Sequence, residues 1–161
     1  MKQTFVLFLL IFGFSQVSAQ APKLVGKTAP EISLKNLEGE TENLSDYRGK
    51  VVLVEFWAGW CGPCIKDMKT WLKPMYSEYK SEGFEVFAVN YDKTEASWKR
   101  STERFQVPWP QVWDYATAEA YKDYNVEVIP TNYLVDQNGK IVARNIKGAK
   151  LSKKLDQLLS Q

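Results

Sequence analysis

The sequence predicts a single α/β domain in which helices flank a mixed central sheet. Three observations support this class: a β-rich apolar run at 51–58 between glycines, an apolar stripe with three- and four-residue spacing directly after it, and Asn138-Gly139 between two alternating apolar runs. Strand and helix alternate first, and a hairpin and a last helix follow, which combines parallel and antiparallel strands in one sheet. With 161 residues and 45% hydrophobic content, the chain can bury one core, and we expect one domain at 20–161.

Residues 1–19 have the layout of a secretory signal peptide. Lys2 precedes an apolar run from Phe5 to Phe14, and the small-residue sequence Val-Ser-Ala ends at Ala19. An uncleaved membrane anchor is the alternative, but a spanning helix needs about 20 apolar residues, and this run is about half that length. We therefore expect cleavage after Ala19 and a soluble, exported, periplasmic protein.

The N-terminal part of the domain is expected to form a small hairpin. Its strands are ISL at 32–34 and TENL at 41–44, which Glu38-Gly39 separates. A turn at 44–49 then leads into the buried strand.

The segment after that strand changes to helical periodicity. Pro74 lies within this expected helix and should kink it, because proline lacks the N–H that the helix ladder needs. The apolar stripe that predicts the helix consists of Cys64, Met68, Leu72, Met75 and Tyr79.

The second half of the chain supplies the remaining elements. Thr94 or Asp92 is expected to cap the helix at 94–105. A strand at 84–90 is expected before this helix, and a proline-rich extended segment at 107–113 and a short helix at 117–124 are expected after it. Hairpin strands at 132–136 and 140–144 follow, and the chain closes with a helix whose apolar stripe is Leu151, Leu155, Leu158 and Leu159.

Composition excludes several classes of function. Lys and Arg total 21 against 19 for Asp and Glu, so the net charge of +2 predicts no nucleic-acid partner. Histidine is absent, which removes Cys-His and Ser-His-Asp catalysis. Two cysteines without histidine are too few ligands for zinc, and a zinc site shared between two chains is the alternative. We expect no metal and no bound cofactor, so thiols, carboxylates and the backbone must carry the chemistry.

The two cysteines, Cys61 and Cys64, lie where the buried strand gives way to the helix. Unpaired N–H groups and the helix dipole stabilise an anion there, so Cys61 is expected to be the more exposed thiol and the nucleophile. Cys64, one turn further, is expected to be the buried resolving thiol, and Pro63 fits the first helical turn. A bridge across so short a loop constrains the unfolded chain little, which argues against the alternative of an inert structural disulfide.

Glu55 is the one ionisable residue within the apolar strand. If it is buried, its pKa should rise, and its carboxyl could exchange a proton with the Cys64 thiol. A solvent-facing Glu55 at a sheet edge is the alternative. Asp67 is a second candidate proton acceptor, although an Asp in the first turns also complements the helix dipole.

The motif WCGPC at 60–64, preceded by VLVEFWA and followed far downstream by Val128-Ile129-Pro130-Thr131, resembles the active site of the thioredoxin superfamily. With the leader, the opening VGKTAPEISLKNLEGE and an extra helix and extended segment between Asn90 and Tyr124, the chain is similar to exported TlpA/ResA-like thiol-disulfide oxidoreductases. That resemblance implies a thioredoxin-like fold and reduction of disulfides outside the cytoplasm, in cytochrome c maturation among other tasks.

The resemblance also implies roles for residues around the cysteines. It makes Pro130 a cis-proline that lies against the pair, and it makes Trp60 an apolar lip that shields the thiols. Trp98, Trp109 and Trp113 either extend this lip or, as we expect, pack the inserted segment. The implied set is Cys61, Cys64, Glu55 and Pro130 for catalysis, Trp60, Gly62, Pro63 and Ile129 for substrate binding, and Asp67 and Trp57 in support.

Two other classes of function compete with a disulfide reductase. A peroxiredoxin-like peroxidase is one, since its opening segment is similar, but Ala58-Gly59-Trp60 precedes Cys61 where a peroxidase has Pro and Thr or Ser. A non-enzymatic thioredoxin-fold binding module is the other, but such a module needs neither cysteine. For a reductase we expect a monomer that acts on protein disulfides or dithiols and takes electrons from a membrane thiol-disulfide carrier.

Overall fold

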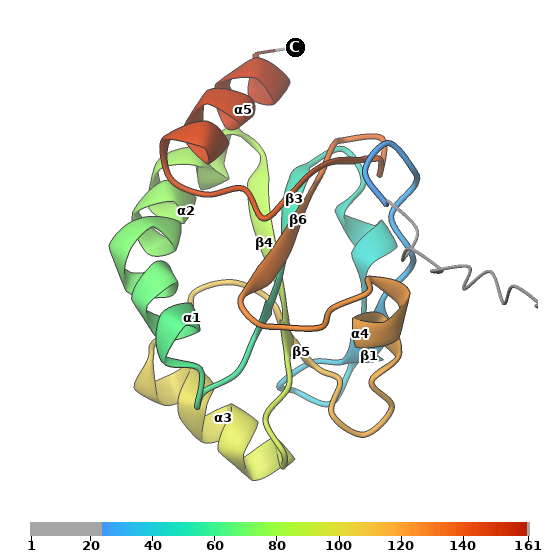
Figure 1. Cartoon of the computed structure of the whole chain (residues 1–161), viewed down its shortest axis with the longest axis vertical. Coiled ribbons are helices and arrows are strands. Elements are labelled where there is room, and N and C mark those ends of the chain that lie inside the picture. The colour runs from blue at the N-terminus through green and yellow to red at the C-terminus, as the bar shows by residue number, and fades with distance from the viewer. Residues whose placement is uncertain (1–23, 161) are drawn as a thin grey trace, which may run out of the picture.

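The computed structural model describes residues 24–160 and confirms the mixed α/β architecture (Figure 1). The expected signal peptide at 1–19 lies outside the described residues. One sheet has the strand order β5-β4-β3-β6-β7, with β4 parallel to both β3 and β5, and β6 antiparallel to both β3 and β7. Its strands are β3 (Val51–Trp57), β4 (Phe84–Asn90), β5 (Gln111–Trp113), β6 (Thr131–Val135) and β7 (Ile141–Arg144).

Strand β3 is the central strand, and every one of its residues is buried. Successive side chains of a strand point to opposite faces of the sheet. Val51, Leu53 and Trp57 accordingly pack in the core cluster that also contains both cysteines, whereas Val52 and Val54 belong to the cluster on the other face. Burial on both faces explains why this run is continuously apolar.

The helix after β3 is interrupted. It begins as α1 (Gly62–Asp67), passes through a π-helical segment, η2 (Met68–Leu72), and continues as α2 (Lys73–Tyr79). The predicted disturbance at Pro74 therefore takes the form of a π turn just before the proline, which accommodates the missing N–H. The expected apolar stripe still packs on the sheet, together with Leu151 and Leu155 of α5 (Ala149–Leu159).

The N-terminal hairpin is formed by β1 (Ser33–Lys35) and β2 (Thr41–Asn43), and the expected turn after it is the short 3-10 helix η1 (Leu44–Tyr47). A second short 3-10 segment, η3 (Lys80–Glu82), ends the α2 region before β4.

Two helices lie in the extra segment between β4 and β6. Thr94, and not Asp92, caps α3 (Glu95–Arg104), through a capping box with Ser97. The next helix, α4 (Glu119–Asp123), begins two residues later than predicted, because the Asp114 carboxylate accepts hydrogen bonds from the Thr117 hydroxyl and the Glu119 N–H. Trp98 and Trp109 are buried here, and Trp98 stacks on Trp113 with ring centroids 6.5 Å apart, so these rings pack the segment as expected.

Candidate active site

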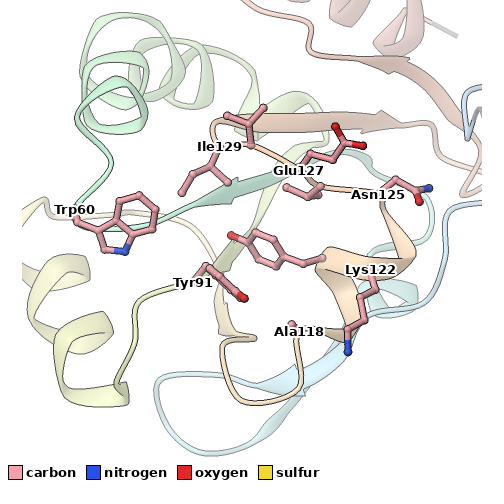
Figure 2. Close-up of a pocket in the computed structure, with 10 residues that line it drawn as sticks. Trp60, Tyr91, Ala118, Lys122, Asn125, Glu127 and Ile129 are labelled. Atoms are coloured by element: carbon pink, nitrogen blue, oxygen red, sulfur yellow. The ribbon is translucent and has the colours of Figure 1, made fainter. Parts of the chain in front are cut away.

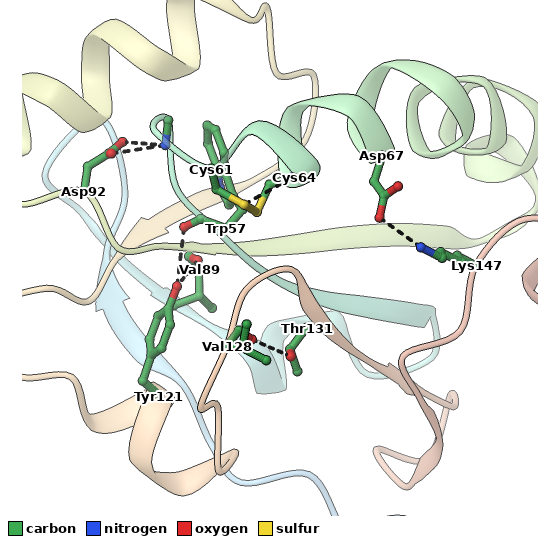
Figure 3. Close-up of a disulfide and its surroundings, with 11 residues drawn as sticks. Trp57, Cys61, Cys64, Asp67, Val89, Asp92, Tyr121, Val128, Thr131 and Lys147 are labelled. Carbon is green, nitrogen blue, oxygen red and sulfur yellow. Dashed lines mark hydrogen bonds and ion pairs between the residues drawn. A yellow bond between two sulfur atoms is a disulfide. The ribbon is translucent and has the colours of Figure 1, made fainter.

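The two cysteines lie at the junction of β3 and α1, at one end of the sheet (Figure 3). They form a disulfide with an S–S distance of 2.01 Å and a Cα–Cα distance of 5.2 Å. Cys61 is the N-cap of α1, and its sulfur accepts a hydrogen bond from the Cys64 N–H at 3.2 Å. Gly62 and Pro63 fill the first helical turn, where the missing N–H of proline has no consequence.

The expected difference in exposure between the two thiols is absent in the disulfide form. Cys61 is 4% exposed and Cys64 is 3% exposed. Both side chains belong to the same core cluster, and the bridge holds the Cys61 sulfur in that layer. What distinguishes Cys61 is its position at the helix N-terminus, where the Cys64 N–H points at its sulfur. Trp60 just before it is 65% exposed, and its role as an apolar lip over the thiols stays a prediction.

Glu55 is buried in the middle of β3, so its alternative placement at a solvent-facing edge is wrong. It is 5% exposed and has the same parity on the strand as Leu53 and Trp57, which places its side chain on the face that carries the cysteines. Burial is the largest effect on the Glu55 carboxyl and raises its pKa to about 8. A hydrogen bond from the Asn132 side chain acts in the opposite direction and lowers the pKa. The Glu55 Oε2 atom has no hydrogen-bond partner among the described residues.

Asp67 and Lys147 form an ion pair on the same side of the sheet. Their Oδ2 and Nζ atoms are 3.5 Å apart, and Figure 3 shows Asp67 pointing down from the helix that carries the cysteines. The negative charge of Asp67 raises the pKa of Glu55, and the positive charge of Lys147 lowers it. The two candidate proton acceptors are therefore electrostatically coupled, and Asp67 is the more solvent-accessible of the two.

The predicted cis-proline is confirmed, since the Ile129-Pro130 peptide bond is cis. Ile129 packs against the core cluster that contains both cysteines and also against the cluster on the other face of the sheet. Val128 is exposed, and its carbonyl accepts a hydrogen bond from the Thr131 hydroxyl at 2.7 Å. Within residues 24–160, the backbone N–H and C=O of Ile129 form no hydrogen bond. Direct contact between Pro130 and the cysteines stays a prediction.

A groove with a volume of about 730 Å³ extends from Trp60 along the cis-proline loop (Figure 2). Figure 2 shows Tyr91 and Trp60 lying on the side of the hollow opposite the loop that carries Glu127 and Ile129. The aromatic and aliphatic part of its lining consists of Trp60, Tyr91, Ala118, Tyr121, Val126, Val128 and Ile129. The site thus combines two sulfur atoms with a neighbouring groove whose lining is mainly apolar.

Several partners of the site residues were not found from the sequence. Trp57, which the resemblance named in support, is buried beneath the site, and its Nε1 donates a hydrogen bond at 3.0 Å to the side chain of Gln111, which the sequence did not point to. Asn132 Oδ1 accepts a hydrogen bond from the Ile146 N–H at 3.0 Å. The Asn132 side-chain amide nitrogen is therefore the group that donates to Glu55. These partners are remote in sequence from the motif, and only the pairing of β3 with β6, which sets Glu55 opposite Asn132, reveals the contact.

Asp92 anchors the loop that precedes Cys61. Its carboxylate accepts two hydrogen bonds from the Gly59 N–H, at 3.1 and 3.2 Å (Figure 3). It also accepts the Ser101 hydroxyl at 2.7 Å and the Asn90 side-chain amide at 3.1 Å. Gly59 lies so close to α3 that a Cβ atom built on it would be 2.4 Å from the Ser101 Cβ. The motif loop is thus fixed against α3 at a position that tolerates no side chain.

Gly59→Ala is therefore expected to destabilise the protein. The new methyl would collide with a Cβ that is attached to helix backbone, and overpacking of this kind costs about 1–3 kcal/mol, or a fall of roughly 5 °C in melting temperature. Thermal unfolding of the oxidised protein measures this. Gly62→Ala is the matched control, because a Cβ there meets no atom within 4 Å. A Gly59→Ala protein as stable as the Gly62→Ala protein would show that α3 moves away without cost.

Comparison with known proteins agrees with this geometry. Residues 24–159 match the family model described as Redoxin. The chain belongs to the Redoxin family. Within the family it is similar to the thiol-disulfide oxidoreductase ResA of Bacillus thuringiensis subsp. konkukian, with 34% identity over 85% of this chain and 78% of the relative. ResA of Geobacillus kaustophilus is 40% identical over 73% of this chain and 66% of the relative.

Solved structures show the same relationship within the Redoxin family. The thioredoxin domain of a thiol-disulfide oxidoreductase from Bacteroides vulgatus superposes with a TM-score of 0.77 and 32% identity, over 86% of this chain and 99% of that one. A putative thiol:disulfide interchange protein DsbE from Chlorobium tepidum superposes with a TM-score of 0.72 and is 31% identical, over 84% of this chain and 95% of that chain. The predicted ResA/TlpA-like, thioredoxin-like fold and the activity class, thiol-disulfide oxidoreductase, are confirmed.

Proposed function

We propose that this Redoxin-family protein reduces disulfides of polypeptides outside the cytoplasm, with Cys61 as nucleophile and Cys64 as resolving thiol. The observation that carries this assignment is the hydrogen bond from the Cys64 N–H to the Cys61 sulfur at the start of α1. The same N–H would stabilise a Cys61 thiolate, which is the reactive form in thiol exchange.

The cycle begins with the reduced dithiol. The Cys61 thiolate attacks one sulfur of the substrate disulfide, a mixed disulfide forms, and the other substrate sulfur leaves as a thiolate that takes up a proton. Cys64 then loses its proton, attacks the Cys61 sulfur and releases the second substrate thiol, which leaves the Cys61–Cys64 disulfide seen here. Two electrons pass from the protein to the substrate, so the proposed cycle needs no bound cofactor.

Glu55 is the proposed acceptor of the Cys64 proton, with Asp67 as the alternative. A buried carboxyl whose pKa lies near 8 exchanges protons at neutral pH, and Glu55 faces the layer that contains Cys64. The Asn132 amide orients this carboxyl, and Asp67 and Lys147 tune its charge.

A polypeptide substrate fits the surface around the disulfide. The unpaired backbone N–H and C=O of Ile129 can pair with an extended chain in the manner of strand addition, while Trp60 and the apolar groove contact its side chains. Gly62 and Pro63 are exposed at the start of α1 and complete the proposed contact surface. Hydrogen peroxide needs only a small opening, so a groove with a volume of about 730 Å³ favours a polypeptide over a peroxide substrate.

The proposed location rests on the sequence of the leader. No helix within residues 24–160 is both long enough and apolar enough to span a bilayer. We propose that the leader is removed and that the monomeric, periplasmic protein receives electrons from a membrane thiol-disulfide carrier. Cytochrome c maturation is one process in which such a reductase serves.

The reduction potential of the Cys61/Cys64 couple tests the direction of electron flow. We expect a value near that of thioredoxin, about −270 mV, when the protein lacking residues 1–19 is equilibrated in thiol redox buffers. A value near that of DsbA, about −120 mV, would instead mean a disulfide donor, with the residue roles retained. Catalytic consumption of hydrogen peroxide would favour the peroxidase, and full biological function of a variant that lacks both cysteines would favour a binding module.

A further inference from the structure

A second hollow shares Trp60, and no other lining residue, with the apolar groove. Its volume is about 420 Å³, and it is formed by the loop at Gly59 and Trp60, the start of the extra segment and one face of α3. Three of the side chains that line it are cationic: Lys93, Arg100 and Arg104. Trp60 also lines the apolar groove, so a substrate bound at the disulfide has the apolar groove on one side and this basic hollow on the other.

The cations are concentrated on one face of α3. Ser97, Arg100, Ser101 and Arg104 follow a spacing of three and four residues, which places them on a single helical stripe. Acidic residues of the same helix are outside this stripe and do not line the hollow. Glu95 pairs with Lys99 at 2.7 Å on another face.

None of the three cations has a carboxylate partner within residues 24–160. Asp92 also lines the hollow, but it is buried, and its carboxylate already accepts hydrogen bonds from Gly59, Ser101 and Asn90. Arg100 and Arg104 are four residues apart on a helix, an arrangement in which like charges repel. An anionic ligand in the hollow would relieve that repulsion.

This positive charge is local. The whole chain has a net charge of only +2, so three unpaired cations beside the motif loop are not a consequence of a generally basic surface. Phe105, which also lines the hollow and contacts the Arg104 guanidinium with 5.3 Å between the cation and its ring, adds an apolar wall. A surface with cations and a ring beside a disulfide is complementary to an acidic chain segment.

We propose that the basic hollow binds acidic side chains next to the cysteine of the polypeptide substrate. The proposal rests on the proposed function, because it names the class of polypeptide that reaches Cys61. Trp60 separates the two hollows, so the acidic residues lie on one side of the substrate cysteine and the apolar residues on the other. The hollow thus determines that acidic polypeptides are preferred, and it determines the direction in which the polypeptide chain crosses the site.

The test compares peptides that differ only in charge. Each of four peptides contains one intramolecular disulfide and one flanking segment. The segment is either acidic, with Asp and Glu, or neutral, with Asn and Gln, and it is placed either before or after the reactive cysteine. Wild type is expected to reduce the acidic peptide about tenfold faster in kcat/KM, in one of the two orientations only. Arg100→Gln/Arg104→Gln is expected to remove that preference and to leave the rate with bis(2-hydroxyethyl) disulfide within about twofold of wild type.

Lys150→Gln/Lys153→Gln removes the same charge from α5, far from the lining of this hollow, and is expected to keep the preference. A control that loses the preference equally, or a wild type that treats the four peptides alike, would overturn the proposal.

A binding measurement separates this proposal from the proposed function. The same peptides with Ser in place of Cys cannot react, and their affinity for the oxidised protein is measured at low and high salt. Tighter binding of the acidic peptide, lost in Arg100→Gln/Arg104→Gln and weakened by salt, supports the hollow even if the protein reduces no peptide. Equal affinities for acidic and amide peptides would overturn the hollow even if the protein is an active reductase.

Discussion

The Cys64→Ser variant is expected to accumulate a covalent mixed disulfide between Cys61 and its substrate. Without the second thiol the first exchange still proceeds, but no intramolecular attack releases the substrate. Catalytic turnover should fall by about a thousandfold or more. Incubation of the reduced variant with a disulfide-containing protein, followed by non-reducing electrophoresis and mass spectrometry, measures the adduct and locates it.

Cys61→Ser is the matched control, because it retains one thiol in the same fold. It is expected to form little adduct, since Cys64 lies within the helix and not at its N-cap. The comparison is sharp because the two side chains are almost equally buried in the disulfide form, so exposure alone does not assign the roles. An adduct that forms faster on Cys64 than on Cys61 would reverse the proposed order of attack.

The parts of the site that the sequence predicts are those encoded locally. Glu55 could be placed in a buried strand because apolar residues flank it on both sides, and Cys61 at a helix start because the periodicity changes there. The cis bond at Pro130 followed from resemblance, and the structure confirms it. Each of these inferences needed only a short window of sequence or a recognisable motif.

The parts that were missed depend on pairs of residues that are remote in the chain. Asn132 and Lys147 reach Glu55 only through the pairing of β6 with β3 and the loop that follows β7. Asp92 was considered as a helix cap, yet it holds the Gly59 N–H and fixes the motif loop. The exposure of Cys61 was misjudged because a disulfide draws both sulfurs into the core, whereas the prediction considered each thiol separately.

Replacing Glu55 with Gln is expected to flatten the dependence of stability on pH. Burial raises the pKa of Glu55 to about 8 in the folded protein, from a usual value of 4.5. The resulting contribution to stability is fully present below pH 4.5 and is lost as the pH rises through about 8, because the folded state binds the proton more tightly. Between pH 4.5 and pH 7, the free energy of unfolding that Glu55 contributes falls by about 3 kcal/mol. Denaturant unfolding of oxidised wild type and Glu55→Gln across this range measures it, and parallel stability curves would contradict it.

The same variant distinguishes the two candidate proton acceptors in catalysis. If Glu55 accepts the Cys64 proton, wild-type release of substrate from the mixed disulfide should accelerate as Glu55 ionises towards pH 8. Glu55→Gln should lose that inflection and slow release about 10- to 100-fold at pH 7. Asp67→Asn should keep the inflection and move it to lower pH, because the Asp67 charge raises the pKa of Glu55. Single-turnover rates measured against pH decide the matter: an inflection that survives in Glu55→Gln and disappears in Asp67→Asn would transfer the role to Asp67.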